Sequence, residues 1–269
     1  MRQSRTASGV ASLLLAAAAA FAGPTAGEAA PRTTAIGYVA LGDSYAAGVG
    51  AGGYLASGTE CLRSDRAYPA LWADAHAPSS FDFTACNHAR TGDVLAGQLG
   101  PLSPRTGLVT LTVGGSDAGF VRVMATCALP GHAACLSAVA AANSFMDATL
   151  PGNLDRLYTA ITRKAPAARV VVLGYPRLYQ LQGTCARGLQ DTERSALNAA
   201  VDHLDRVIAR RAAAHGFVFA DVRTAFAGHE ICSSSPWLHS VDWLDLTDSY
   251  HPTASGQSLG YLPALTGAV

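Results

Sequence analysis

The chain has 269 residues, and its 19 lysine and arginine residues are balanced by 19 aspartate and glutamate residues. This balance excludes a strongly basic nucleic-acid-binding protein, so no nucleic-acid partner is expected. The length that follows the first 30 residues is that of one ordinary α/β domain or one large all-β domain. Such a domain buries a full core without the help of metal ions.

The N-terminal segment has the three parts of a secretory signal peptide. Arg2 and Arg5 carry positive charge, residues 13–20 are apolar, and small residues lead to Ala29 and Ala30. We therefore predict a signal peptide over residues 1–30, cleaved near Ala29 or Ala30, and a single secreted domain over the remaining residues, 31–269. The apolar run is shorter than the roughly 20 residues that cross a bilayer, and a retained amphipathic anchor is the alternative.

Short apolar runs alternate with helical stretches along the rest of the chain, which is typical of βαβ units. Continuous apolar strands separated by helices indicate a parallel sheet that is covered on both faces. We therefore predict a three-layer α/β/α domain with a five-stranded parallel sheet. In chain order, the expected elements are strand 38–41, helix 68–76, strand 81–85, strand 108–113, a mostly helical stretch 133–164 with a break at 151–152, strand 169–173, helix 191–215 capped by Asp191, strand 217–220 and helix 253–264 capped by Thr253.

All six cysteines follow the predicted signal peptide. An even number of cysteines in an exported chain indicates disulfide bonds, although the sequence alone leaves the pairing open. A zinc site is the alternative, but the chain has no C-x-x-C pair of ligands. We expect near neighbours to pair, as Cys61–Cys86, Cys127–Cys135 and Cys185–Cys232.

Ser44 directly follows the first predicted strand, in the stretch Gly42-Asp43-Ser44-Tyr45. In parallel α/β folds, ligands bind beyond the carboxyl ends of the strands, so the Ser44 hydroxyl is expected at the binding crevice. Backbone N–H groups at the start of the following helix can face a developing oxyanion. A plain helix N-cap is the alternative use of a serine at this place.

His251 lies in the stretch Asp248-Ser249-Tyr250-His251-Pro252, just before the last predicted helix. A serine hydroxyl needs a base to become a nucleophile, and a histidine can be that base. Pro252 restricts His251 to extended backbone. The Asp248 carboxylate could accept a hydrogen bond from the imidazole and fix its tautomer. A surface histidine in a turn is the alternative.

These motifs occur in an order that resembles the SGNH/GDSL hydrolases, above all their secreted three-disulfide bacterial lipases and phospholipases A. The order is GDSY at Ser44, Gly-Gly-x-Asp at 114–117 and Asp-x-x-His-Pro at 248–252. The resemblance runs from about residue 38 to the C-terminus, and it implies a flavodoxin-like SGNH hydrolase fold. It also implies that Ser44 is the nucleophile, His251 the base and Asp248 the third member of a triad.

Two positions depart from the pattern of that family. The second characteristic motif of the family carries a glycine where this chain has His88. The third, Gly-x-Asn-Asp, carries an asparagine where this chain has Ser116. The resemblance implies that the Ser44 N–H, the His88 N–H and the Ser116 hydroxyl hold the oxyanion. Losing one such donor typically lowers the rate by about 100- to 1,000-fold.

The sequence therefore predicts a secreted serine carboxylic ester hydrolase that forms an acyl-enzyme on Ser44. The expected substrates are small-molecule or lipid esters, with at most transient contact with a lipid surface, and we expect a monomer. Neither a cofactor nor a metal ion is expected. The alternatives are an acyltransferase that uses the same acyl-enzyme, and a secreted binding protein that keeps the fold without activity.

Overall fold

The computed structural model describes residues 36–56, 59–129, 131–185, 188–243 and 246–269. The predicted signal peptide and its cleavage sites lie outside the described residues. No single helix in these ranges is long and apolar enough to cross a membrane. The helices His132–Ala148 (α5) and Leu150–Lys164 (α6), with a bend of 48° between them, pass that test together by length and composition.

A five-stranded sheet forms the centre of the domain, and all of its strand pairs are parallel, as predicted. The order β2-β1-β3-β4-β5 places β1, β3 and β4 in the interior of the sheet, where β-branched and other apolar side chains are buried on both faces. The strands are β1 (Gly37–Gly42), β2 (Ser80–Phe83), β3 (Thr106–Thr112), β4 (Arg169–Leu173) and β5 (Val218–Ala220).

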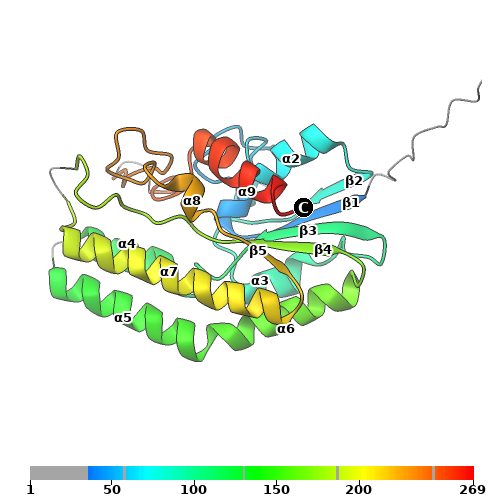
Figure 1. The fold of residues 1–269 in the computed structure, drawn as a ribbon, viewed down its shortest axis with the longest axis horizontal. Helices are drawn as coiled ribbons and strands as arrows, with labels where there is room; N and C mark the ends of the chain where they lie inside the picture. The colour runs from blue at the N-terminus through cyan, green and yellow to red at the C-terminus, as the bar shows by residue number, and fades with distance from the viewer. Residues whose placement is uncertain (1–35, 57–58, 130, 186–187, 244–245) are drawn as a thin grey trace, which may run out of the picture. The chain divides into compact units, whose positions relative to one another are not determined.

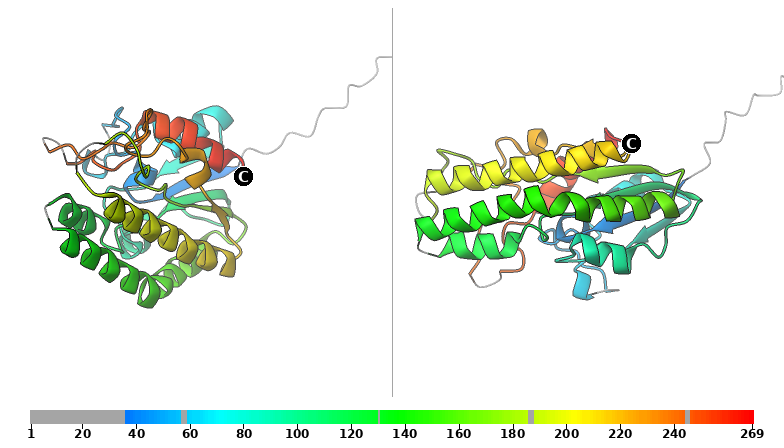
Figure 2. Two further views of the ribbon diagram at one scale, coloured as in Figure 1. Left: turned by 60° about the vertical axis from the view of Figure 1, so that its left-hand side comes forward. Right: turned by 90° about the horizontal axis from the view of Figure 1, so that it is seen from below.

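Helices cover the sheet on two sides, which gives the predicted three layers (Figure 1). One layer contains α2 and α9, and the other contains the long helices α5, α6 and α7 packed side by side (Figure 2). The helical segments are α1 (Ser44–Ala47), η1 (Thr59–Cys61), α2 (Tyr68–His76), α3 (Thr91–Asp93), η2 (Val94–Gln98), α4 (Phe120–Ala128), α5 (His132–Ala148), α6 (Leu150–Lys164), α7 (Asp191–Ala214), α8 (Arg223–Phe226), η3 (Gly256–Tyr261) and α9 (Leu262–Thr266).

Helix boundaries differ from the expectations in three places. The long helical stretch breaks at Thr149, and Pro151 lies in the first turn of α6, where its missing N–H loses no hydrogen bond. Asp191 is not the cap of α7, because Gln190 holds that position and its N–H donates to the Glu193 carboxylate at 2.8 Å. Helix α4 was not predicted at all.

Thr253 does cap the last helical segment. Its hydroxyl accepts a hydrogen bond from the Gly256 N–H at 3.2 Å. The segment then passes through one wide turn, η3, before α9.

Three disulfide bonds join the predicted near neighbours. Because one bond ties α4 to α5 and another ties the segment before α7 to the loop after α8, they restrain long loops around the sheet. The pairs are Cys61–Cys86, Cys127–Cys135 and Cys185–Cys232.

Candidate active site

The strand-to-helix turn after β1 places Ser44 at the carboxyl end of the sheet. Gly42 has a φ of 126°, and a Cβ there would collide with the backbone of Thr112, so glycine is required. Asp43 is the N-cap of α1, and its carboxylate accepts a hydrogen bond from the Tyr45 N–H at 3.1 Å. Ser44 is therefore not the cap, and its hydroxyl remains available for chemistry.

Ser44 and His251 meet across the carboxyl end of the sheet. The Nε2 atom of His251 lies 2.8 Å from the Ser44 Oγ. Both side chains are buried, with 7% of Ser44 and 6% of His251 exposed. This contact can carry the serine proton to the imidazole.

The carboxylate of Asp248 does not contact the imidazole. Its Oδ1 accepts a hydrogen bond from the Tyr54 hydroxyl at 2.9 Å. Among the described residues, the Nδ1 of His251 has no hydrogen-bond partner, and the backbone of Thr247 and Ser249 beside it acts to raise the pKa of the imidazole. The expected Asp248–His251 hydrogen bond is therefore absent. In the tight turn that ends at His251, the Asp248 carboxylate points toward Tyr54, and the backbone of Thr247 and Ser249 lies beside the imidazole ring.

His251 is held in its neutral form. Burial above all, and then the neighbouring His88, lower the pKa of its imidazole to about 4, while the backbone of Thr247 and Ser249 acts to raise it. A neutral imidazole is the form that accepts a proton. The ring is thus ready as a base over most of the pH scale.

His88 has a left-handed backbone, with a φ of 62°. Glycine adopts this conformation without strain, which gives a physical reason for the glycine that the SGNH pattern carries at this place. The side chain of His88 is exposed and lines three cavities, one of which also contacts His251. His88 therefore adopts the same left-handed backbone conformation that a glycine would adopt at this position.

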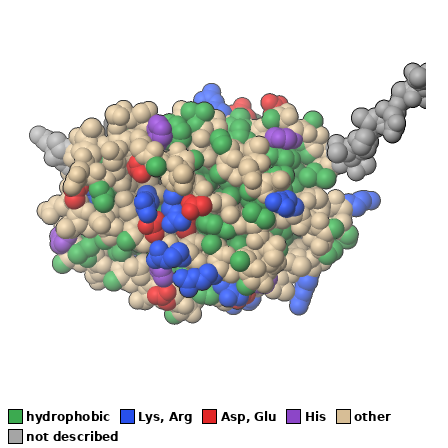
Figure 3. Space-filling view, in the orientation of Figure 1, with side chains coloured by type: hydrophobic (Ala, Val, Ile, Leu, Met, Phe, Trp, Pro, Cys, Tyr) green, Lys and Arg blue, Asp and Glu red, His purple; other side chains and the backbone are tan. Residues whose placement is uncertain are grey.

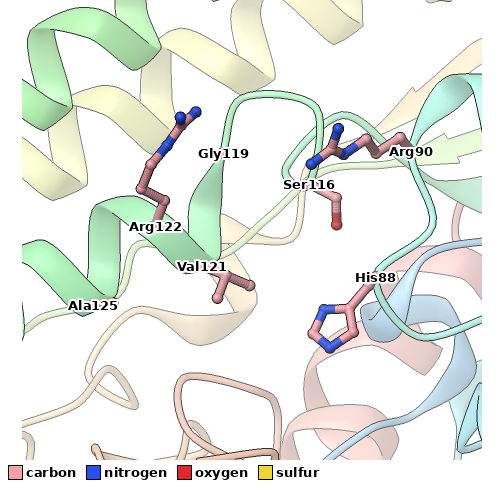
Figure 4. A pocket seen from close by; sticks show the side chains of 7 residues that line it. All are labelled: His88, Arg90, Ser116, Gly119, Val121, Arg122 and Ala125. Atoms are coloured by element: carbon pink, nitrogen blue, oxygen red, sulfur yellow. The ribbon is translucent and has the colours of Figure 1, made fainter.

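The three expected oxyanion donors lie around connected cavities. Ser44 and Ser116 line a narrow cavity of about 30 Å³, and Ser116 and His88 line the wider cavity beside it. Figure 4 shows the Ser116 hydroxyl and the His88 ring facing that wider cavity. Ser44 opens α1, so its N–H has no partner within the helix and is available to an oxyanion.

Behind the nucleophile, a buried network that the sequence did not predict joins three strand ends. The Asp43 carboxylate accepts hydrogen bonds from the hydroxyls of Thr112 at 2.6 Å and Tyr175 at 2.5 Å. The Tyr175 hydroxyl also accepts from the Gly115 N–H at 3.2 Å. Burial raises the pKa of Asp43 to about 6. Tyr175 thereby couples the turn that carries Ser44 to the loop that carries Ser116.

A charged cluster at α7 and α8 fixes Tyr175 in turn. The buried Asp205 carboxylate accepts a hydrogen bond from the Tyr175 N–H at 2.9 Å and lies 3.4 Å from the Arg223 guanidinium. Arg223 and Arg177 both pair with Asp202, at 2.8 Å and 2.9 Å. Figure 3 shows basic and acidic side chains intermingled on this face. Burial raises the pKa of Asp205 to about 8, although the Arg223 guanidinium acts to lower it.

An apolar groove of about 400 Å³ leads from His251 to the surface. Helix α4 forms one wall, and the loop that precedes His251 forms the other. Several apolar side chains at its rim are more than half exposed. These are Val121 (56%), Leu129 (60%), Trp243 (61%) and Leu246 (62%).

The described residues contain no group of three histidine, cysteine, aspartate or glutamate side chains that could hold a metal ion. The imidazole of His251 contacts Ser44, and hydroxyl groups of Ser116 and Tyr175 line the narrow cavity beside it. The arrangement supports nucleophilic attack by a serine with a histidine base.

Known proteins share this arrangement of sequence and fold. The model of the GDSL-like Lipase/Acylhydrolase family matches residues 40–259. The chain is 60% identical to Lipase 1 of Streptomyces coelicolor over 100% of both chains. It is similar to the crystal structure of phospholipase A1 from Streptomyces albidoflavus, at 56% identity and a TM-score of 0.86, over 87% of this chain and 100% of that one. The extracellular lipase of Streptomyces rimosus has 58% identity and a TM-score of 0.85 over the same shares. The chain belongs to the GDSL-like lipase/acylhydrolase family.

Proposed function

We propose that this lipase/acylhydrolase cleaves carboxylic esters of lipids through an acyl-enzyme on Ser44. The observation that carries the proposal is the 2.8 Å contact between the Ser44 Oγ and the His251 Nε2 at the mouth of an apolar groove. The relatives named a lipase and a phospholipase A1 support lipid esters as substrates. The groove is apolar and concave, as an acyl chain requires.

The reaction follows from the positions of the two side chains. His251 takes the proton of the Ser44 hydroxyl while the Oγ attacks the ester carbonyl, and the carbonyl oxygen becomes an oxyanion. The imidazolium then gives this proton to the leaving alcohol as the carbon–oxygen bond breaks. Water, deprotonated by the same imidazole, releases the fatty acid and restores Ser44.

The oxyanion is held by the Ser44 N–H, the His88 N–H and the Ser116 hydroxyl. The backbone of His88 has the left-handed turn that the glycine of the family pattern would adopt. Ser116 has a shorter side chain than the asparagine of that pattern, so it gives a weaker donor. The backbone carbonyls of Thr247 and Ser249, rather than Asp248, orient His251.

A substitution of the nucleophile tests the proposal. Ser44→Ala removes the attacking oxygen, so the kcat on p-nitrophenyl butyrate is expected to fall by at least about 10⁴-fold. Ser79→Ala, an exposed serine beside the opposite end of the sheet, is the matched control and keeps full activity. An organophosphonate should label the native protein at Ser44, and Ser44→Ala should not be labelled. Unchanged ester hydrolysis in Ser44→Ala would refute the proposal.

We also propose that the protein is exported and that its signal peptide is cleaved near Ala29 or Ala30. The three disulfide bonds support an oxidising destination, and a relative is named an extracellular lipase. N-terminal sequencing of the protein from a culture supernatant measures the cleavage site. A mature chain that still carries Arg2 and Arg5 would overturn this proposal.

A further inference from the structure

A second cavity, of about 580 Å³, adjoins the candidate active site and has a different character from the apolar groove. Two arginine side chains line it, Arg90 from the loop before α3 and Arg122 from the first turn of α4. Figure 4 shows the two arginine side chains on either side of Gly119, with Ser116 beside Arg90. The remaining lining residues are His88, Gly119, Val121 and Ala125.

The charge of this cavity is not neutralised by the protein. Neither the Arg90 nor the Arg122 guanidinium forms an ion pair or a hydrogen bond within the described parts of the chain, and no carboxylate is among the lining residues. The nearest carboxylates in sequence are engaged with backbone: Asp93 accepts from the Arg90 N–H at 2.9 Å, and Asp117 accepts from the Thr91 N–H at 2.9 Å. Two guanidinium groups without acidic partners favour an anionic ligand.

The cavity lies where the polar end of a bound lipid would be. It shares Ser116 with the narrow cavity that contains Ser44, and it shares His88, Val121 and Ala125 with the apolar groove. An ester whose carbonyl carbon contacts Ser44 and whose acyl chain fills the groove would therefore direct its remaining half toward the two arginines.

We propose that Arg90 and Arg122 form a subsite for the phosphodiester of a glycerophospholipid. This inference rests on the proposed ester hydrolysis at Ser44 and adds the substrate class that the site selects. A guanidinium presents two parallel N–H groups that match the oxygens of a phosphate, which makes arginine better suited than lysine to this task. Diacylglycerols lack the phosphate and leave the subsite unused, so phospholipids are the preferred substrates.

The double variant Arg90→Gln/Arg122→Gln tests the subsite, because glutamine keeps a similar length and removes the charge. The kcat/KM is measured on monomeric dihexanoylphosphatidylcholine and on dihexanoylglycerol, which carry the same acyl chains. The ratio of the two values is expected to fall at least about tenfold in the double variant. Monomeric substrates keep attraction to a charged membrane surface out of the measurement.

Arg105→Gln is the matched control, because Arg105 is an exposed arginine before β3, at the end of the sheet away from Ser44. It should leave the ratio unchanged. Inorganic phosphate is added as a competitor: inhibition of native phosphatidylcholine hydrolysis at millimolar phosphate would show that free phosphate is also bound. An unchanged ratio in the double variant, or an equal loss on both substrates, overturns the subsite while leaving ester hydrolysis in place.

Binding without turnover separates the subsite from the proposed chemistry. Ser44→Ala is titrated with a short-chain diether analogue of phosphatidylcholine, which cannot be hydrolysed. Its Kd is expected to rise at least about tenfold when both arginines are replaced in the Ser44→Ala background. Equal affinity in the two proteins would refute the subsite even if the native protein proved inactive on every ester.

Discussion

Replacing Asp248 distinguishes a Ser-His pair supported by backbone from a Ser-His-Asp triad. In a triad, loss of the carboxylate leaves the histidine in the wrong tautomer and lowers kcat by about 10⁴-fold, which corresponds to about 5.5 kcal/mol. In this structure the Asp248 carboxylate accepts a hydrogen bond from the Tyr54 hydroxyl, and the carbonyls of Thr247 and Ser249 act on the imidazole. Asp248→Asn therefore removes no contact with His251.

The expected loss is that of one hydrogen bond at the rim of the site. Such a bond contributes about 0.5–1.5 kcal/mol, so kcat on p-nitrophenyl butyrate should fall by no more than about tenfold in Asp248→Asn. Tyr54→Phe removes the same hydrogen bond from the other side, together with the acceptor of the Gly50 N–H, and is also expected to give a small loss. A loss of 1,000-fold or more in Asp248→Asn, on the order of the triad effect, would refute the assignment of the backbone carbonyls as the orienting groups.

Three further predictions follow from the site. The kcat/KM should fall only as the pH drops through about 4, the pKa of His251, because the imidazole acts as a base above that value. A fall in kcat/KM near the ordinary histidine pKa would contradict this. His88→Gln should raise the pH at which kcat/KM falls, because it removes a neighbouring positive charge. Tyr175→Phe leaves the Gly115 N–H without its buried acceptor, so calorimetry should show a loss of about 1–3 kcal/mol in the free energy of unfolding, and an unchanged melting temperature would argue against the network. Ser116→Asn restores the longer donor of the family pattern, so kcat at saturating substrate should rise by about tenfold or more, while a decrease would show that the serine is already well placed.

Acid also acts on stability through the same imidazole. The pKa of His251 in the folded protein, about 4, lies below its ordinary value, so the unfolded chain binds more protons between these two values. The contribution of His251 to the free energy of unfolding is therefore present above the ordinary histidine pKa and is lost as the pH falls toward about 4.

Local patterns in the sequence were sufficient to predict the three layers of the fold. Uninterrupted apolar runs such as 170–173 are buried on both faces in a parallel sheet, and they became strands at or near the expected residues. Helix α4, nine residues long, was not predicted; it lies between the Gly-Gly motif and the next expected helical stretch. The near-neighbour disulfides could be predicted because short loops bring their cysteines together at small entropic cost.

The motifs identified Ser44 and His251 as partners although 207 residues separate them along the chain. Their geometry depends on the order of the strands, because parallel strands bring distant turns to one edge of the sheet. The direction of the Asp248 carboxylate was beyond the reach of the sequence, since spacing along the chain does not say which way a side chain points in a tight turn. The role of Tyr175 could not be predicted either, because its hydroxyl contacts Asp43 and Gly115, which are distant from it in the sequence.

The sequence by itself determined the family, the sheet and the two reacting side chains, since these depend on residue type and on local periodicity. Only the tertiary structure decided which groups surround them. Segments that are distant in the sequence meet to form the surroundings of the site. They supply the backbone carbonyls beside His251, the apolar wall formed by α4 and the cavity lined by Arg90 and Arg122. The directions of the side chains in these places follow from packing rather than from local sequence.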